Sequence, residues 1–205
     1  MIFYGLLAVV FLVGYLFGSI PFGLLLTKAA GLGDIRNTGS GNIGATNVLR
    51  SGKKSLAAGT LILDMAKGFM PVYLMSHFDI SPFAAGLAGL GAMLGHVYPI
   101  WLKFKGGKGV ATYIGVLAGL AWPLGIIFCL IWIATAFLSR ISSLSALIAS
   151  ALVPLTPLFF GNYLSVSLPA SYLVGFLACL SLLIFYTHRE NIGRLLRGEE
   201  SHIGG

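Results

Sequence analysis

Long apolar segments dominate the hydropathy pattern of the chain, and short polar stretches separate them. Segments 1–27, 55–77, 82–102 and 169–187 each contain at most two charged residues and reach the roughly 20 residues that a helix needs to cross a bilayer. Polar and apolar residues do not alternate within these segments, which excludes the strands of a membrane barrel. The pattern therefore predicts an all-α integral membrane protein.

The middle of the chain is compatible with two different numbers of spans. About thirty apolar residues lie between Lys108 and Arg140, too many for one upright helix and few for two. Pro123 and Gly125 lie near the centre of this stretch and favour a break. Two short or tilted helices here, together with segment 144–160, give seven transmembrane helices. One long kinked helix would give six.

Basic residues form three clusters, whereas the connections 77–81 and 161–168 contain no Lys or Arg. Basic loops stay on the cytoplasmic side of a membrane. With seven spans this rule predicts an outside N-terminus and a cytoplasmic C-terminus, whereas six spans would place Arg140 and the last cluster outside. The clusters are Lys28, Arg36, Arg50, Lys53 and Lys54; Lys103, Lys105 and Lys108; and Arg189, Arg194 and Arg197.

Composition supports a single polytopic membrane domain over residues 1–205. With 57% hydrophobic and 9% charged residues, the chain has too few polar side chains to cover a soluble globule. The net charge of +7 would suggest nucleic acid in a soluble domain, but here it fits cytoplasmic loops and anionic ligands. The first segment lacks a basic leader and a cleavage site, so we interpret it as a membrane helix. We expect residues 201–205 to be a frayed end.

A glycine-rich polar loop at residues 39–50 is the first candidate for ligand binding. Its three glycines alternate with Ser, Asn and Thr, which allows the backbone to approach an anion closely. A loop that only caps the next helix is the alternative. Polar groups are costly near lipid, so this density of donors favours a ligand. The predicted substrate-binding residues are Ser40, Gly41, Asn42, Thr46, Asn47 and Arg50.

A second loop, at residues 103–112, places three lysines around a Gly-Gly turn, as a phosphate site requires. It is not a nucleotide P-loop, because Leu102 stands where the first glycine should be and Gly109 replaces the Ser or Thr. Lys103 fits a basic stop after a membrane helix, whereas Lys108 fits a ligand contact. The predicted site residues are Lys105, Gly106, Gly107, Lys108, Gly109 and Thr112.

The third polar stretch, residues 188–199, predicts a short helix that leaves the last span. His188 and Asn191 share one helical face and could reach one substrate. The alternative is a juxtamembrane amphipathic helix that touches lipid headgroups. Both roles stay open for Arg194 and Arg197.

Several polar residues lie closer to the apolar segments. Asp64 and Lys67 are three residues apart, and we predict a mutual ion pair in preference to direct catalysis. We expect His96 to be a hydrogen-bonded structural histidine. Ser142 and Ser143 follow Arg140 in a turn, where either could cap the next helix or reach an anion. Cys and His nowhere cluster at ligand spacing, so we predict no metal site.

Taken together and in this order, these motifs resemble the bacterial acyl-phosphate:glycerol-3-phosphate acyltransferase family, known as PlsY. The resemblance covers nearly the whole chain. Loop 39–50 matches Gly-Ser-Gly-Asn-x-Gly-Ala-Thr-Asn-x-x-Arg, loop 106–112 matches Gly-Gly-Lys-Gly-Val-Ala-Thr, and the tail 191–200 matches Asn-Ile-x-Arg-Leu-x-x-Gly-x-Glu. The helix 63–68 and the turn 142–144 also fit. The family glutamate of the tail matches Glu199 or Glu200; of these we include Glu199 among the predicted substrate-binding residues, with Ser143 and Arg194.

The resemblance implies transfer of a fatty acyl group from acyl phosphate to the 1-hydroxyl of glycerol 3-phosphate, which gives lysophosphatidic acid and phosphate. This reaction is the first acylation of bacterial phospholipid synthesis. It places a multi-pass enzyme in the bacterial inner membrane with its active site on the cytoplasmic side. The expected partners are the two substrates and membrane lipids, with no nucleic acid, no cofactor and no required oligomer.

The predicted catalytic residues are His188, Asn191, Lys108 and Ser142. A His-x-x-x-x-Asp relay is absent, because Trp101 follows His96 at that spacing and Gly193 follows His188. Either His188 or a substrate phosphate could take the hydroxyl proton. We favour the phosphate, since only Glu190 is placed in the sequence to orient the histidine. A carrier for an organic phosphate is the competing class, but it would place its polar residues at the midplane of the bilayer.

Overall fold

A computed structural model describes residues 2–78, 80–81, 83–161, 164 and 169–203 of the chain. Within these residues the regular structure is helical and contains no strand, which confirms the predicted all-α class. The chain divides into two compact units, Met1–Gly119 and Leu120–Gly205, and each is described by itself. Pro82 and most of the predicted connection 161–168 lie outside the described residues.

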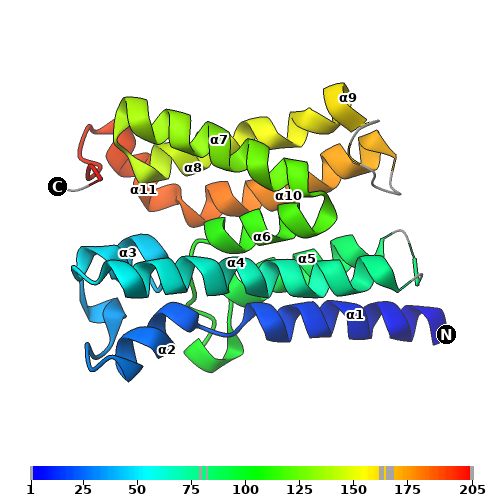
Figure 1. Cartoon of the computed structure of the whole chain (residues 1–205), viewed down its shortest axis with the longest axis horizontal. Helices are drawn as coiled ribbons and strands as arrows, with labels where there is room; N and C mark the ends of the chain where they lie inside the picture. Colours follow the sequence, from blue (N-terminus) through cyan, green and yellow to red (C-terminus); the bar gives the residue numbers. More distant parts are fainter. Residues whose placement is uncertain (1, 79, 82, 162–163, 165–168, 204–205) are drawn as a thin grey trace. The chain divides into compact units, whose positions relative to one another are not determined.

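Three long helices of the first unit, α1, α4 and α5, pack side by side (Figure 1). The shorter elements α2, η1 and α3 gather at the end of the unit away from the N-terminus (Figure 1). The loop 39–50 therefore lies between short elements at one end of a helical scaffold. The elements are α1 (Ile2–Gly18), α2 (Phe22–Ala29), η1 (Ile35–Asn37), α3 (Ala45–Arg50), α4 (Lys54–His77), α5 (Ala84–Val97), η2 (Ile100–Leu102) and α6 (Val110–Leu120).

Glycine allows α1 and α5 to approach until their backbones touch. A Cβ atom added at any of four glycines would overlap a carbonyl oxygen of the other helix. Small residues four apart are the usual basis of such close packing between membrane helices. The contacts are Gly14 with Ala88, Gly18 with Ala92, Gly91 with Phe11, and Gly95 with Tyr15.

The same kind of packing joins α4 to α6. A Cβ at Gly115 would overlap the carbonyl oxygen of Met65, and one at Gly68 would overlap that of Thr112. Tyr113 of α6 is fully buried. Because backbone atoms cannot move aside as a flexible side chain can, these contacts fix the position of α6 against α4 closely.

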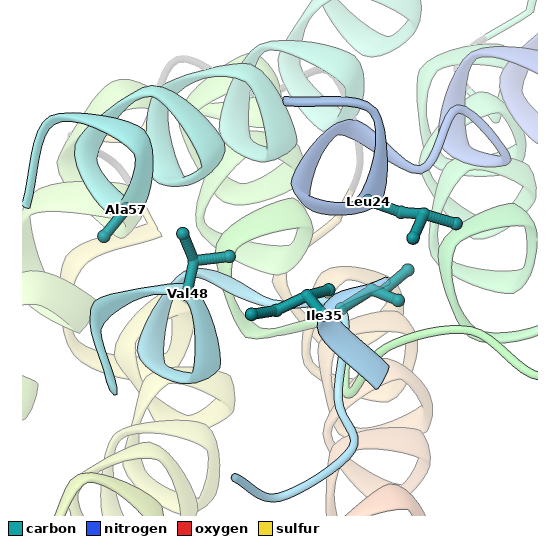
Figure 2. Close-up of a cluster of buried hydrophobic side chains, with 5 residues drawn as sticks. Leu24, Ile35, Val48 and Ala57 are labelled. Atoms are coloured by element: carbon teal, nitrogen blue, oxygen red, sulfur yellow. The ribbon is translucent and has the colours of Figure 1, made fainter. Parts of the chain in front are cut away.

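A small apolar cluster supports the end of the first unit that carries loop 39–50. It consists of Leu24, Ile35, Ile43, Val48 and Ala57, all buried, from α2, η1, the loop, α3 and α4 (Figure 2). The elements α2, η1 and α3 have at most eight residues and are too short to be stable alone, so the core that they share with α4 holds them in place.

The second unit consists of a helical hairpin, α7 and α8, with α10 packed against α8, η3 and α9. The hairpin turn is tight because Arg140 takes a left-handed conformation at φ 57°. The elements are α7 (Trp122–Ser139), α8 (Ser142–Leu152), η3 (Val153–Leu155), α9 (Thr156–Phe160), α10 (Ala170–Thr187) and α11 (Arg189–Leu196).

Five helical segments among the described residues are long and apolar enough to cross a membrane. The first combines α1 and α2 and is broken at residues 19–21, a break that the sequence pattern did not predict. The predicted separation of the stretch between Lys108 and Arg140 into two helices is observed as α6 and α7. The shorter α6 and the more polar α4 are not among the five, which are Phe3–Ala29, Ala84–Leu102, Trp122–Ser139, Ser142–Phe160 and Ala170–Thr187.

The end of the chain differs from the expectation of a frayed tail. The backbone N–H of Ile203 donates to the carbonyl oxygen of Arg140 at 2.7 Å. The tail is thus fastened to the turn between α7 and α8, and the expectation is wrong for residues 201–203. Residues 204–205 lie outside the described residues.

Candidate active site

Asn47 determines the shape of the loop at residues 39–50. Its side chain is buried, and its Nδ2 donates to the carbonyl oxygens of Ile35 (3.0 Å), Thr38 (3.0 Å) and Asn42 (2.8 Å). Its Oδ1 accepts from the backbone N–H of Ser40 at 2.9 Å. These bonds engage both N–H groups and the oxygen of the amide. The contacts support a role for Asn47 in organising the loop, and its predicted role in substrate binding stays a prediction.

Glycines make this arrangement possible. Gly39 has φ 56°, and a Cβ there would overlap Oδ1 of Asn47. Gly41 also takes a left-handed conformation, at φ 70°. Asn42 accepts from the N–H of Gly44 at 3.1 Å, at the start of α3. The remaining predicted binders of the loop are on its surface: Ser40, Gly41, Thr46 and Arg50 are exposed, and Asn42 is half-buried.

His96 lies beneath the second loop and supports it. The N–H of Gly107 donates to the carbonyl oxygen of His96 at 3.1 Å, and the N–H of Gly106 donates to that of Val97 at 3.0 Å. The ring Nδ1 of His96 lies 3.1 Å from Oγ1 of Thr112, and both side chains are buried. The prediction of a hydrogen-bonded structural histidine is confirmed. Thr112 lies in the support of the loop, and its predicted contact with substrate stays a prediction.

The second loop contains an unusual concentration of left-handed backbone. Lys103 (φ 53°) and Phe104 (φ 62°) are consecutive non-glycine residues in this region, and Gly109 follows at φ 88°. For a residue with a side chain this conformation costs about 1–2 kcal/mol. Lys105 is exposed and Lys108 half-buried. Strained backbone of this kind is typical of functional loops.

In the second unit, the carboxylate of Glu200 brings three predicted site residues together. It accepts hydrogen bonds from Oγ of Ser143 (2.8 Å), Nδ2 of Asn191 (2.6 Å) and Nε of Arg194 (2.6 Å). Burial acts to raise the pKa of Glu200, but the hydrogen bonds from these three side chains outweigh it and hold the pKa below its usual range. Glu200 is therefore ionised near neutral pH.

The structure separates the two glutamates that the sequence left as alternatives. Glu199, the predicted binder, pairs with Arg197 at 2.7 Å, and both side chains are more than half exposed. Gly198 takes φ 71° just beyond α11 and reverses the chain, so that Glu200 points back to the helix. Glu200 is thus the glutamate that contacts other predicted site residues. Counted from Gly198, the Gly-x-Glu spacing of the motif matches Glu200, and this spacing is the signal that could have selected it from the sequence.

His188 is buried where α10 ends and α11 begins. Its Nδ1 lies 2.8 Å from the carbonyl oxygen of Ile184. A carbonyl oxygen can only accept, so Nδ1 carries the proton and Nε2 of the neutral ring is the acceptor. A backbone carbonyl therefore orients the histidine, and the exposed Glu190 is not needed for this. The predicted short helix after the last span is confirmed as α11.

The two serines of the α7–α8 turn do not cap α8, contrary to one of the predicted roles. The residue before α8 is Ile141, and no side chain caps the helix. The backbone N–H of Ile141 instead donates to Oγ of Ser139 at 3.2 Å. Ser143 donates to Glu200, whereas Ser142 is half-buried at the first position of α8.

Asp64 and Lys67 form the predicted ion pair. Nζ of Lys67 lies 2.7 Å from Oδ1 of Asp64, and both side chains are almost fully buried. In the part of the chain that the structure describes, no group of three or more His, Cys, Asp or Glu side chains is placed to hold a metal ion.

Comparison with known proteins agrees with these features. The sequence model of the glycerol-3-phosphate acyltransferase family matches residues 8–198. The chain belongs to this family. A glycerol-3-phosphate acyltransferase of Bradyrhizobium diazoefficiens is 58% identical over 198 residues, which cover 97% of this chain and 96% of the relative. One of Mesorhizobium japonicum is 58% identical over 202 residues, covering 98% of this chain and 97% of the relative.

Two solved structures of this acyltransferase family are similar to the chain. The crystal structure of the integral membrane enzyme PlsY (YgiH) in its glycerol 3-phosphate form has a TM-score of 0.86 and 36% identity, and covers 97% of this chain and 96% of that one. The lysophosphatidic acid form has a TM-score of 0.84 and 35% identity, and the match covers 96% of this chain and 94% of the PlsY chain. The resemblance found in the sequence is therefore confirmed at the level of the family.

Proposed function

We propose that this acyltransferase moves a fatty acyl group from acyl phosphate to the 1-hydroxyl of glycerol 3-phosphate. The hydroxyl oxygen attacks the carbonyl carbon, the bond from that carbon to the phosphate oxygen breaks, and lysophosphatidic acid and phosphate leave. The acceptor and product are supported by similarity over nearly the whole chain to PlsY structures titled as glycerol 3-phosphate and lysophosphatidic acid forms. The donor is supported by the motif resemblance.

The first unit supplies donors suited to phosphate oxygens. Ser40, Thr46 and Arg50 are exposed on a loop whose shape is fixed from beneath, so their positions are set before a ligand arrives. In the second loop, Lys108 follows a Gly-Gly turn that is fixed on His96. We propose that these four residues contact the phosphates. Gly41, Asn42, Asn47, Lys105, Gly106, Gly107, Gly109 and Thr112 complete the proposed binding loops.

Arg50→Lys tests this assignment. A guanidinium grips phosphate with two parallel hydrogen bonds, which an ammonium cannot replace. We expect kcat/KM for glycerol 3-phosphate to fall at least tenfold, with Arg36→Lys as a control on an exposed arginine already paired with Asp34. Activity near the wild-type level would remove Arg50 from the phosphate site.

The second unit supplies His188, Asn191 and Ser142, with Ser143, Arg194 and Glu200 in support. Acyl phosphate is an activated anhydride, so the main tasks are orientation and stabilisation of charge. The proton of the attacking hydroxyl goes to Nε2 of His188 or to an oxygen of a substrate phosphate. We favour the phosphate, because the group that orients His188 is a neutral backbone carbonyl, which stabilises a protonated imidazole less than a carboxylate would.

His188→Ala distinguishes the two bases when kcat and KM are measured with glycerol 3-phosphate varied and acyl phosphate held at saturation. A general base contributes a factor of about 10²–10⁴ to turnover. If the substrate phosphate is the base, we expect a rise in KM with only a modest change in kcat. A loss of turnover in the range of a general base, with KM unchanged, would instead assign the proton to His188.

We further propose one domain with seven crossings, an outside N-terminus and an active site on the cytoplasmic face of the inner membrane. The helices α4 and α6 would add the two crossings beyond the five long apolar segments. Single cysteines at the exposed residues Arg50, Lys105 and Glu190, in a variant without Cys129 and Cys179, test this with a membrane-impermeant reagent. All three must react from the cytoplasmic side; labelling of any of them from the outside would contradict the proposed orientation.

The decisive assay uses purified protein in detergent. We expect phosphate release from acyl phosphate that depends on glycerol 3-phosphate, with one lysophosphatidic acid formed for each phosphate released. Acyl thioesters serve as alternative donors in the same assay. Product formation from a thioester alone would leave the acyltransferase intact and overturn the proposed donor.

A further inference from the structure

The buried pair of Asp64 and Lys67 has no part in the proposed chemistry, yet it occupies the centre of α4. Its side chains are 3% and 2% exposed. Two buried charges seldom stabilise a fold more than apolar side chains of equal size would, because their desolvation is costly. Charges inside a membrane protein usually mark a functional requirement. The contacts of Lys67 indicate what that requirement is.

Lys67 reaches beyond its own helix to the break between α1 and α2. Its Nζ donates to the carbonyl oxygen of Ile20 at 2.7 Å. The break leaves backbone carbonyls without their helical partners, and Pro21 has no N–H to offer. The ring of Phe22, the first residue of α2, lies 5.8 Å from the same ammonium group. Lys67 therefore stabilises the exact residues at which the first apolar segment bends.

The break is also the place where the two candidate phosphate loops of the first unit are connected. On one side, α2 carries loop 39–50, because Gly23 packs directly on the carbonyl of Ile43. On the other side, Nε1 of Trp101, two residues before the second loop, donates to Oγ of Ser19 at 2.8 Å. A shift of residues 19–21 would move one loop relative to the other.

The neighbour of Lys67 in α4 touches the second loop as well. Gly68 packs on the carbonyl oxygen of Thr112, so closely that a Cβ would overlap it. One turn of α4 thus contacts the break through Lys67 and the end of the second loop through Gly68. Asp64 balances and orients the ammonium group within this turn.

We propose that Asp64 and Lys67 are positioning residues for acyl transfer, with Lys67 setting the distance between loop 39–50 and loop 103–112 through Ile20. Neither residue touches substrate. This inference rests on the proposed function, since it assumes that both loops bind the phosphates. A displacement of about 1 Å at a reacting centre can lower turnover about 10²-fold.

Three variants separate the effect of the hydrogen bond that Lys67 donates to Ile20 from the effect of the two buried charges. Asp64→Asn with Lys67→Met removes both charges and the bond to Ile20, at nearly constant volume. The exchange Asp64→Lys with Lys67→Asp keeps a pair of opposite charges, but the carboxylate at position 67 cannot donate to Ile20. Lys67→Arg keeps both the charge and the donor.

We expect the charge-free variant and the exchange variant to be monodisperse and to lose about 10²-fold in kcat, whereas Lys67→Arg stays within a few-fold of wild type. Wild-type-like kcat and KM in a folded charge-free variant would overturn the proposal, as would full activity of the exchange variant. Absence of acyl transfer in the wild type would overturn the proposed function. Failure of the positioning proposal is distinct, because it is seen only as unchanged activity in the variants of an active wild type.

A measurement of geometry decides the matter even for a variant with no activity. Spin labels at Leu49, within loop 39–50, and at Lys103, within loop 103–112, report the distance between the two loops, since both residues are exposed and both lie in the first unit. We expect this distance to shift or its distribution to broaden in the charge-free variant and not in Lys67→Arg. An unchanged distribution in both variants would overturn the role of Lys67.

Discussion

The two units hold their polar residues in place by different physical means. In the first unit, backbones touch at glycines, and the two loops are fixed by hydrogen bonds to Asn47 and by contacts with His96. In the second unit, one carboxylate, Glu200, collects the side chains of Ser143, Asn191 and Arg194. One arrangement depends on the absence of side-chain atoms, whereas the other depends on a charge.

This difference determines how each unit can fail. Contacts between backbones have no room for an added methyl group but do not change with pH. A network around a carboxylate tolerates changes in the bulk of exposed neighbours but loses its bonds when the charge is removed. Added volume at the glycine contacts should therefore reduce the stability of the first unit most, whereas loss of the Glu200 charge should reduce the stability of the second unit most.

The largest effect on stability is expected for Gly115→Ala in α6. The new Cβ would overlap the carbonyl oxygen of Met65, and backbone cannot yield without shifting a helix. We expect a loss of about 3 kcal/mol, at the upper end for overpacked cores. The matched control is Gly175→Ala in α10, where nothing lies within 4 Å of the added atom. Thermal unfolding in detergent measures both, and equal midpoints would contradict the role of close backbone packing.

Removing the charge at the centre of the second unit comes next. Glu200→Gln weakens three hydrogen bonds and leaves Arg194 without its partner, so we expect a loss of about 2 kcal/mol, typical of charged hydrogen bonds, and reduced turnover. Glu199→Gln, at the exposed pair with Arg197, should change stability by less than about 0.5 kcal/mol. If the two variants unfold at the same temperature, Glu200 does not organise the unit.

The same network predicts a dependence on pH. The pKa of Glu200 is lower in the folded protein than in the unfolded chain, so its contribution is complete above the unfolded value of about 4.3 and is lost as pH falls below it. The difference in unfolding temperature between wild type and Glu200→Gln should therefore shrink in acid. The hydrogen bond from Arg36 lowers the pKa of Asp34 to about 2. Asp34 is present in both proteins, so its contribution to the pH dependence cancels in the difference. A difference that does not change between pH 7 and about pH 3, well below the unfolded pKa, would argue against the network.

The smallest effect is expected at the end of the chain. Ile203→Pro removes the N–H that donates to the carbonyl of Arg140 and should cost about 1 kcal/mol, the net value of one hydrogen bond. Ile203→Ala keeps the N–H and serves as the control. We expect faster proteolysis of the tail only in the proline variant. Identical cleavage rates would show that this bond does not hold the tail.

Particular residues show how far the sequence could be read. The paired charges of Asp64 and Lys67, the structural role of His96 and the helix after His188 followed from local spacing. The close approach of α1 and α5 was missed, although the repeats of Gly14 with Gly18 and Gly91 with Gly95 are a signal that sequence reasoning could have used. No local pattern indicated that Asn47 would organise its own loop, since a polar residue in a loop can face a ligand or the backbone.

The sequence by itself determined the class of the protein, because long apolar segments can satisfy their backbone only as helices in a membrane. It also determined the family, because three polar motifs in a fixed order are specific. Only the tertiary structure decided which polar side chains hold the loops in shape and which remain exposed to solvent. That choice depends on contacts between residues far apart in the chain, such as Lys67 with Ile20 and Ser143 with Glu200, and no periodicity or spacing encodes such contacts.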